Sequence, residues 1–339
     1  MAKKILIVGP AWVGDMVMAQ SLAKTLRLQD PDAVIDILAP GWSLPIIERM
    51  SEVRRGVELP IGHGELELAR LWRLGRNLRS EHYDQAIVLP RKFKAALVPF
   101  FAGIPQRTGY RGEFRYWLIN DMRPLDKKLL SQTVLRFTAL GLPAAPQAPP
   151  LQQPALSVDP VSQKAKIAEL GLDNTRPAVA FMAGAEYGPA KQWPAQYYGQ
   201  VAAEMIRSGK QVWVFGAGKE QALGEEIRAA AGNPAEEEGF INLCGRTALA
   251  DVVDLISACE VAVCNDSGLM HVAAAAGTPL VAIYGSSTPD YTPPLTDKAQ
   301  VLYLGIECSP CFERTCPLGH YNCLRHIKPE SVLQAVRSS

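Results

Sequence analysis

The sequence lacks long apolar runs. No stretch approaches the roughly 18 apolar residues that a membrane-spanning helix needs. The apolar stretch that opens the chain, residues 5–8, is too short for the core of a signal peptide, and no small-residue cleavage site follows it. We therefore expect a cytoplasmic protein.

Two common nucleotide-binding motifs are also missing. The first glycine-bounded turn, residues 9–15, has no Gly-Lys-Ser/Thr sequence, which excludes a P-loop, and its G-x4-G spacing is not that of a dinucleotide fingerprint. The string Gly-Ala-Gly-Lys at 216–219 is too short to be a phosphate loop. Any nucleotide site must therefore be built differently.

Charge is distributed unevenly along the chain. The net charge is +1, yet residues 1–150 hold 21 Lys and Arg against 14 Asp and Glu, whereas residues 151–339 hold 14 against 20. A basic half favours binding to a polyanion, which is a phosphate-bearing lipid, a membrane surface or a nucleic acid. The alternative is that the excess positive charge lies on solvated helix faces and has no role in binding.

Four of the seven cysteines are clustered. Cys244, Cys259 and Cys264 lie in apolar surroundings and are expected to be buried. The others have the spacing C-x2-C-x4-C-x6-C and are Cys308, Cys311, Cys316 and Cys323. They have the chemistry to hold zinc or an iron–sulfur cluster, since a reducing cytosol disfavours disulfides. The spacing matches no standard motif, so unligated or redox-active thiols are the favoured interpretation.

Short apolar strands alternate with helical segments in both halves. Strands are expected at 4–8, 34–38, 85–89, 178–182, 211–215, 241–243, 261–264 and 280–284, and helices at 16–28, 195–208, 220–231, 249–258 and 269–276. Six prolines between 143 and 160 predict a linker. We therefore predict an α/β protein with two doubly wound, Rossmann-like domains, 1–155 and 156–339, facing across a cleft.

The loop after the first strand places Asp15 next to Gly14, where a helix begins. A carboxylate there has the position to cap the helix. It is also well placed to act as a general base, because the glycine lets a ligand approach the backbone. Both interpretations stay open from the residues alone.

Two later loops have the residues of a phosphate site. Lys191, just before the helix at 195–208, is placed to neutralise a diphosphate. After the strand at 261–264, Asp266 and Ser267 are expected to cap a helix whose free N–H groups, from Gly268 onward, suit a phosphate. His271 either reaches this site or is a satisfied buried histidine.

Two further sets of residues are candidate contacts. Glu220 follows the strand at 211–215, so its carboxylate is a candidate acceptor for a ribose hydroxyl. The basic half places cations after the strand ending at Leu89 and in the segment 106–115, and these are the expected contacts of an anionic acceptor: Arg91, Lys92, Lys94, Arg107, Arg111 and Arg115. The apolar run 95–101 is expected to be buried, with contact to a membrane interface as the alternative.

These loops, in this order, resemble the ADP-heptose lipopolysaccharide heptosyltransferases, most closely the heptosyltransferase II branch. The similar stretches cover nearly the whole chain and are GPAWVGDMVMAQSL (9–22), IGHGELELAR (61–70), KFKAALVPFFAGIPQRTGYRGEFRY (92–116), GAEYGPAKQWP (184–194), NDSGLMHVAAA (265–275) and TPPL (292–295). The resemblance implies a GT-B architecture with an ADP-heptose donor held mainly by the second domain.

The resemblance also implies roles for individual residues. Asp15 is expected to be the general base and Lys191 the diphosphate-binding lysine. The remaining donor contacts are expected from Glu186, Tyr187, Glu220, Asp266, Ser267, Gly268 and His271. No cofactor is expected and no metal ligands are assigned. The four-cysteine segment is not shared by the whole family, so the resemblance implies no role for it.

The implied reaction is an inverting transfer of L-glycero-D-manno-heptose to the first heptose of heptosyl-Kdo2-lipid A. The implied partners are ADP-heptose and this phosphorylated acceptor, presented at the cytoplasmic face of the inner membrane, with no nucleic acid. A monomer, peripheral to that membrane, is expected. The alternatives are another acceptor within the family, a nucleotide-sugar epimerase on the same architecture, and a non-catalytic nucleotide- or lipid-binding module.

Overall fold

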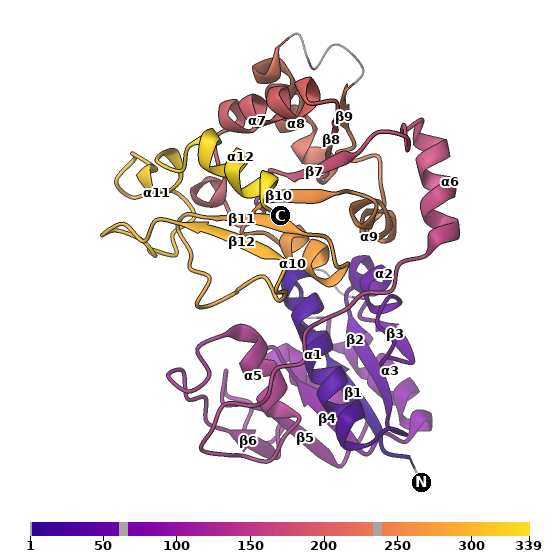
Figure 1. Ribbon diagram of the computed structural model, residues 1–339. Coiled ribbons are helices and arrows are strands. Elements are labelled where there is room, and N and C mark those ends of the chain that lie inside the picture. Colours follow the sequence, from indigo (N-terminus) through magenta and orange to yellow (C-terminus); the bar gives the residue numbers. More distant parts are fainter. Residues whose placement is uncertain (1, 61–66, 233–238) are drawn as a thin grey trace. The chain divides into compact units, whose positions relative to one another are not determined.

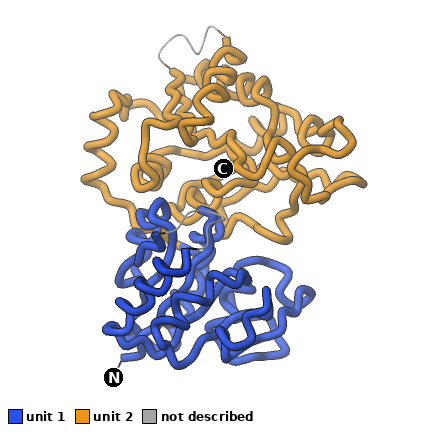
Figure 2. The backbone as a smooth tube through the Cα atoms, turned by 180° about the vertical axis from the view of Figure 1, so that it is seen from behind, with its two compact units in different colours: residues 1–154 blue, residues 155–339 orange. Residues whose placement is uncertain are grey.

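The computed structural model describes residues 2–60, 67–232 and 239–339. The chain forms two compact units, Met1–Pro154 and Ala155–Ser339 (Figure 2). The boundary falls inside the proline-rich stretch, one residue from the predicted position. Of the family-like stretch 61–70, residues 61–66 lie outside the described part.

Unit 1 contains a parallel six-stranded sheet (Figure 1). The strands, in spatial order, are β3 (Arg55–Glu58), β2 (Val34–Ala39), β1 (Lys4–Val8), β4 (Gln85–Val88), β5 (Gln106–Tyr110) and β6 (Asp121–Arg123). The helices are α1 (Val13–Gln29), α2 (Leu44–Ile47), α3 (Leu68–Leu78), α4 (Leu97–Phe101) and α5 (Thr133–Leu140), with short 3-10 turns η1 (Gly41–Ser43), η2 (Arg79–Glu81) and η3 (Phe93–Ala96). Helix α1 packs with α5, and α3 packs with α4.

Unit 2 repeats this plan. Its parallel strands, in spatial order, are β12 (Ala299–Tyr303), β11 (Leu280–Tyr284), β10 (Val261–Asn265), β7 (Ala178–Met182), β8 (Gln211–Val214) and β9 (Phe240–Asn242). Its helices are α6 (Pro160–Leu170), α7 (Ala195–Arg207), α8 (Gln221–Ala231), α9 (Leu249–Ser257), α10 (Gly268–Ala275), α11 (Asn322–Arg325) and α12 (Pro329–Arg337), with 3-10 turns η4 (Pro189–Lys191) and η5 (Gly218–Glu220).

The two sheets share one strand order. Counted from the first strand of each unit, both run 3-2-1-4-5-6, the order of a doubly wound nucleotide-binding fold. In such sheets ligands bind at the carboxyl ends of the strands where the order reverses. That point lies between β1 and β4 in unit 1 and between β7 and β10 in unit 2.

Alternating side chains of the central strands explain why both faces of each sheet are covered. Val179 and Phe181 of β7 pack in one apolar cluster with α7 and α12, whereas Ala180 and Met182 pack in another with α9 and α10. A parallel strand buried on both faces reads as a continuous apolar run. This is why the central strands were predictable from sequence.

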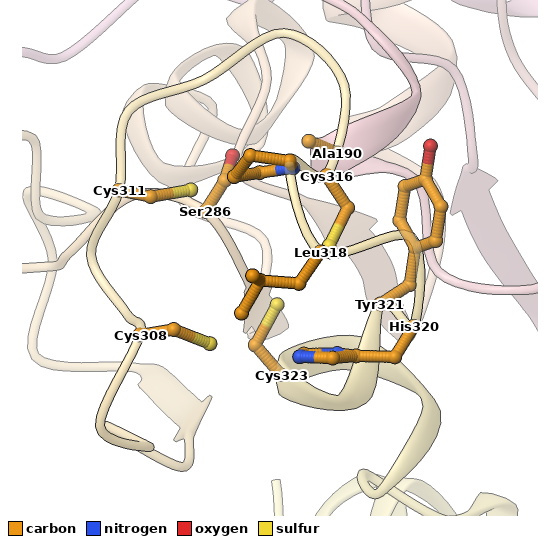
Figure 3. Close-up of a pocket in the computed structure, with 10 residues that line it drawn as sticks. Ala190, Ser286, Cys308, Cys311, Cys316, Leu318, His320, Tyr321 and Cys323 are labelled. Carbon is orange, nitrogen blue, oxygen red and sulfur yellow. The ribbon is translucent and has the colours of Figure 1, made fainter.

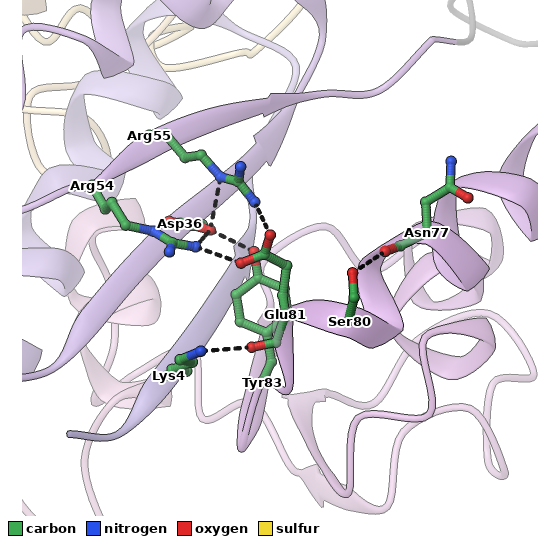
Figure 4. Close-up of polar contacts among 8 residues, drawn as sticks. All are labelled: Lys4, Asp36, Arg54, Arg55, Asn77, Ser80, Glu81 and Tyr83. Carbon is green, nitrogen blue, oxygen red and sulfur yellow. Dashed lines mark hydrogen bonds and ion pairs between the residues drawn. The ribbon is translucent and has the colours of Figure 1, made fainter. Parts of the chain in front are cut away.

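A buried carboxylate connects neighbouring segments at one edge of the unit 1 sheet. Asp36 of β2 is fully buried and accepts hydrogen bonds from Arg54, Arg55 and Tyr83 (Figure 4). Burial acts to raise the pKa of Asp36, but the hydrogen bonds from Arg54 and Tyr83 and the charge of the two arginines outweigh it and lower the pKa. Glu81 binds the same two arginines, so the cluster connects β2, β3 and η2.

The sequence-based assignment was incomplete at the sheet edges. It missed β3, β5, β6 and β12, which are short or only half-buried. It also missed α5, α6 and α12. The run 95–101 is largely buried, from Ala96 to Pro99, as expected, while Phe100 is half-exposed. None of the helices in the described ranges has the length and apolar character needed to cross a bilayer.

Candidate active site

Lys191 and Asp266 form an ion pair at the reversal point of the unit 2 sheet. Lys191 ends η4, in the loop after β7, and Asp266 directly follows β10. The Lys191 ammonium lies 2.5 Å from a carboxylate oxygen of Asp266, which also accepts a hydrogen bond from the Ser287 hydroxyl. Both side chains are largely buried. Two loops separated by 75 residues in sequence therefore converge on one charged pair.

The start of α10 lies beside this pair. Ser267 is at the N-cap position, but its side chain makes no capping hydrogen bond within the described residues, contrary to expectation. Asp266 does not cap the helix in its place, because its carboxylate is held by Lys191 and Ser287. The first N–H groups of α10, from Gly268 onward, are thus free of a side-chain cap and suit an anion.

His271 is buried in the same helix. Its exposed fraction is 4%, and its Nδ1 atom is buried with no hydrogen-bond partner among the described residues. Burial lowers the His271 pKa to about 4; Asp266 opposes this shift and Lys191 adds to it. The imidazole is therefore neutral at pH 7, and its buried Nδ1 lies beside the Lys191–Asp266 pair, while its role at the site stays a prediction.

Aromatic and charged groups shape the loop before Lys191. The Tyr187 ring has Lys191 Nζ 5.3 Å from its centroid, and the Arg314 guanidinium lies at the same distance. Glu186 is exposed and pairs with Lys219 at the surface. Tyr187 thus belongs to the charged pair's surroundings, whereas Glu186 lies further out in the same loop.

Asn265 joins the two loops at their base and was not predicted. Its Nδ2 donates to the carbonyl of Ala183, and its Oδ1 accepts from the Trp193 N–H and the Tyr198 hydroxyl, each at 3.1 Å. A fully buried amide with all these bonds holds the ends of β7 and β10 together. Its position at a strand end was visible in the sequence, but its partners were not.

Glu220 lies at the ends of β7 and β8. Its carboxylate accepts a hydrogen bond of 2.7 Å from the Ala217 N–H. Gly184 and Gly216 both pack against this carboxylate, with no room for a side chain at either position. The strand-end placement expected for a ribose contact is thus observed, and its ligand stays a prediction.

Asp15 lies at the reversal point of the unit 1 sheet. It is the third residue of α1, directly after β1, and it is half-buried, while Trp12 occupies the N-cap position. The carboxylate is therefore in the first helical turn, and not at the cap position proposed as its structural role.

Basic residues after β4 and β5 border one open cavity of about 460 Å³. Its lining consists of Arg91, Lys92, Arg111, Gly112 and Glu113. Lys92 pairs with Glu113 at 2.8 Å, and Arg111 donates to the Tyr116 hydroxyl. Lys94, one turn further on, is half-buried. The cations of unit 1 thus lie after β4 and β5, and β4 is one of the two strands between which the strand order reverses.

The structure corrects one predicted acceptor contact, Arg115. Arg115 is 0% exposed, and its guanidinium donates to the carbonyls of Pro90, Lys92 and Tyr110. Burial and, to a smaller extent, the charge of Arg91 lower its pKa to about 10, while Glu113 opposes the shift. Arg107 is half-buried and donates to the carbonyls of Ile104 and Leu118, and its contact with the acceptor stays a prediction. Both arginines hold the chain in place, since backbone carbonyls left unpaired in the interior are costly.

Known proteins resemble this chain over its whole length. Residues 71–322 match the glycosyltransferase family 9 (heptosyltransferase) family. The chain belongs to glycosyltransferase family 9. Lipopolysaccharide heptosyltransferase 2 of Salmonella typhimurium is 46% identical over 99% of this chain and 98% of that protein. Lipooligosaccharide heptosyltransferase 2 of Haemophilus influenzae is 47% identical over 97% of both chains.

A solved structure agrees with this assignment. Escherichia coli ADP-heptose lipopolysaccharide heptosyltransferase II is 43% identical, with a TM-score of 0.89 over 99% of this chain and 98% of that chain. The predicted α/β class and GT-B architecture are thereby confirmed. Membership of glycosyltransferase family 9 also makes this chain a glycosyltransferase, and the epimerase alternative is not favoured.

Sequence reasoning missed other residues around the family 9 site. Ser287 and Arg314 contact Asp266 and Tyr187 from segments that carry no motif. Phe114 and Trp117 are 86% and 85% exposed and follow Glu113, which lines the basic cavity of unit 1, in the sequence. The sequence offered one signal for these two residues, which is that they are aromatic and lie close to Arg111 and Arg115.

Proposed function

We propose that this enzyme transfers L-glycero-D-manno-heptose from ADP-heptose to the first heptose of heptosyl-Kdo2-lipid A. The observation that carries the proposal is the Lys191–Asp266 pair beside the uncapped start of α10, at the reversal point of the unit 2 sheet. The relatives named heptosyltransferase 2, and the solved ADP-heptose lipopolysaccharide heptosyltransferase II of Escherichia coli, support the choice of donor and acceptor.

The donor diphosphate binds between Lys191 and the first N–H groups of α10. Positive charge at both places is desolvated and already oriented, so it stabilises the negative charge that grows on the departing ADP. Asp266 keeps the Lys191 side chain in this position, and Tyr187 covers it. Glu220 accepts hydrogen bonds from the ribose, and the neutral His271 adds a hydrogen bond to the phosphates.

The acceptor hydroxyl is activated by Asp15. Its carboxylate removes the proton while the hydroxyl oxygen attacks the anomeric carbon, the bond to ADP breaks, and the configuration inverts. The first N–H groups of α1 stabilise the ionised carboxylate in the first turn of that helix.

The anionic acceptor is held by the basic cavity of unit 1. Lys92, Lys94 and Arg111 provide positive charge for its phosphates. Phe114 and Trp117 are highly exposed, and aromatic side chains next to cations suit the boundary between lipid and water. These features fit the expected site of action at the cytoplasmic face of the inner membrane.

Mass spectrometry of the products tests this function. ADP-heptose with heptosyl-Kdo2-lipid A is expected to give an acceptor heavier by one heptose residue, and ADP. Kdo2-lipid A without the first heptose is the matched control and is expected to stay unmodified. Transfer to the control alone would point to a different acceptor, and an isomerised sugar from donor alone would point to an epimerase.

A further inference from the structure

The four clustered cysteines line a single small cavity in unit 2. Cys308, Cys311, Cys316 and Cys323 lie around it with their sulfurs turned inward (Figure 3). The cavity encloses about 20 Å³, which is room for one particle of the size of water. None of the four thiols is in a disulfide. Residues spread over 16 positions of an irregular segment therefore line one cavity.

The cysteine segment also supports the loop that carries Lys191. The Ala190 N–H donates to the carbonyl of Arg314, and the Phe312 N–H donates to the carbonyl of Ser286, at 3.0 and 2.7 Å. Ser309 donates to the carbonyl of Gly285. Ala190 and Ser286, which neighbour Lys191 and Ser287, are themselves part of the cavity lining. The fold of this segment and that of the proposed diphosphate site are therefore coupled.

We propose that Cys308, Cys311, Cys316 and Cys323 bind one zinc ion as four thiolate ligands, and that this ion fixes the support for the Lys191 loop. Four sulfur donors lining one small cavity suit tetrahedral zinc, and the size of the cavity suits one ion better than a cluster of several irons. Within the described ranges no group of three or more potential ligands is already set around an ion position, so binding draws the sulfurs closer together. Each thiol releases its proton to solvent as it binds.

Metal analysis of the full chain tests the zinc site without any substrate. We expect one zinc per chain after purification without chelators, loss of that zinc when a mercurial titrates the thiols, and uptake of one Zn²⁺ once the thiols are freed. Cys308→Ser and Cys316→Ser are expected to lose the ion, while Cys259→Ala, at a buried cysteine outside the cavity, is expected to keep it. Native protein with no zinc that also takes up none, iron with sulfide, or a disulfide among the four would overturn the proposal.

The coupling to the Lys191 loop is tested by ADP binding and rests on the proposed donor site. Zinc-free protein is expected to bind ADP about fivefold or more weakly than zinc-loaded protein, and ADP is expected to tighten zinc binding by the same factor. Equal ADP affinity in the two forms would refute the supporting role. Absence of ADP binding in both forms would instead contradict the donor site, while the zinc content stands as a separate measurement.

Discussion

Gly184 and Glu220 lie so close together that a Cβ atom on Gly184 would stand 1.6 Å from the nearer carboxylate oxygen. The loop after β7 therefore passes directly over the carboxylate at the end of β8. A side chain at position 184 forces Glu220 to move, which makes this glycine a sensitive probe of the proposed ribose contact.

Gly184→Ala is expected to weaken ADP binding about tenfold, the scale of one charge-assisted hydrogen bond of ~1.5 kcal/mol. Calorimetry with ADP measures this. The matched control is Gly218→Ala, where the added methyl meets only an ordinary contact at 3.9 Å. In a Glu220→Ala background, Gly184→Ala should cost little more. An undiminished penalty in that background would show that the glycine acts through something other than Glu220.

Asp15→Asn is expected to lower kcat about 100-fold, the usual scale for a lost general base. ADP affinity should stay unchanged, because the proposed donor site belongs to unit 2. Asp32→Asn, at an exposed carboxylate of the same unit, is the control. Steady-state kinetics that leave kcat within a factor of two of the native value would remove Asp15 from the mechanism.

Lys191→Met is expected to have two separable effects. It leaves the buried Asp266 carboxylate without its cation, which should destabilise the fold by about 2 kcal/mol, and it should abolish detectable ADP binding. Adding Asp266→Asn should restore most of the stability and none of the affinity. Lys219→Met, which breaks an exposed pair with Glu186, should change stability by about 0–1 kcal/mol. Recovery of ADP binding in the double variant would contradict the role of Lys191.

His271 predicts a specific pH dependence of stability. Its pKa is lowered from 6.5 to about 4 in the folded state, so below pH 6.5 the unfolded chain binds a proton that the folded chain does not. The free energy of unfolding should therefore fall between pH 6.5 and 4, by up to about 3 kcal/mol from this residue. In urea unfolding measured across this pH range, His271→Gln should reduce the fall in the free energy of unfolding. His326→Gln, at an exposed histidine, should leave the fall unchanged. Parallel profiles for native protein and His271→Gln would exclude this cause.

The central strands and their loops were predictable because apolar runs mark buried parallel strands, and ligand loops follow them. Strand β12 was missed because its residues are only partly covered, with Val301 40% exposed. Helix α6 was missed because Pro160 was read as part of the linker; the structure places it at the first helical position, after an Asp159 cap.

The site was less predictable where the role of a side chain depends on its hydrogen-bond partners. Arg115 and Arg111 are four positions apart and equally basic in the sequence, yet one is buried against carbonyls and the other borders a cavity. Which carbonyls lack a partner depends on long-range packing. The same holds for Asn265, whose partners come from segments over 60 residues away.

The common strand order of the two sheets has a consequence for how such an enzyme diversifies. Each unit carries its ligand loops on its own central strands, so substitutions that retune one recognition surface leave the scaffold of the other intact. The preference for the sugar donor and the preference for the acceptor can then change independently during evolution. Chimeras that exchange one half between relatives, joined within the proline-rich stretch, should inherit each preference from the parent of that half.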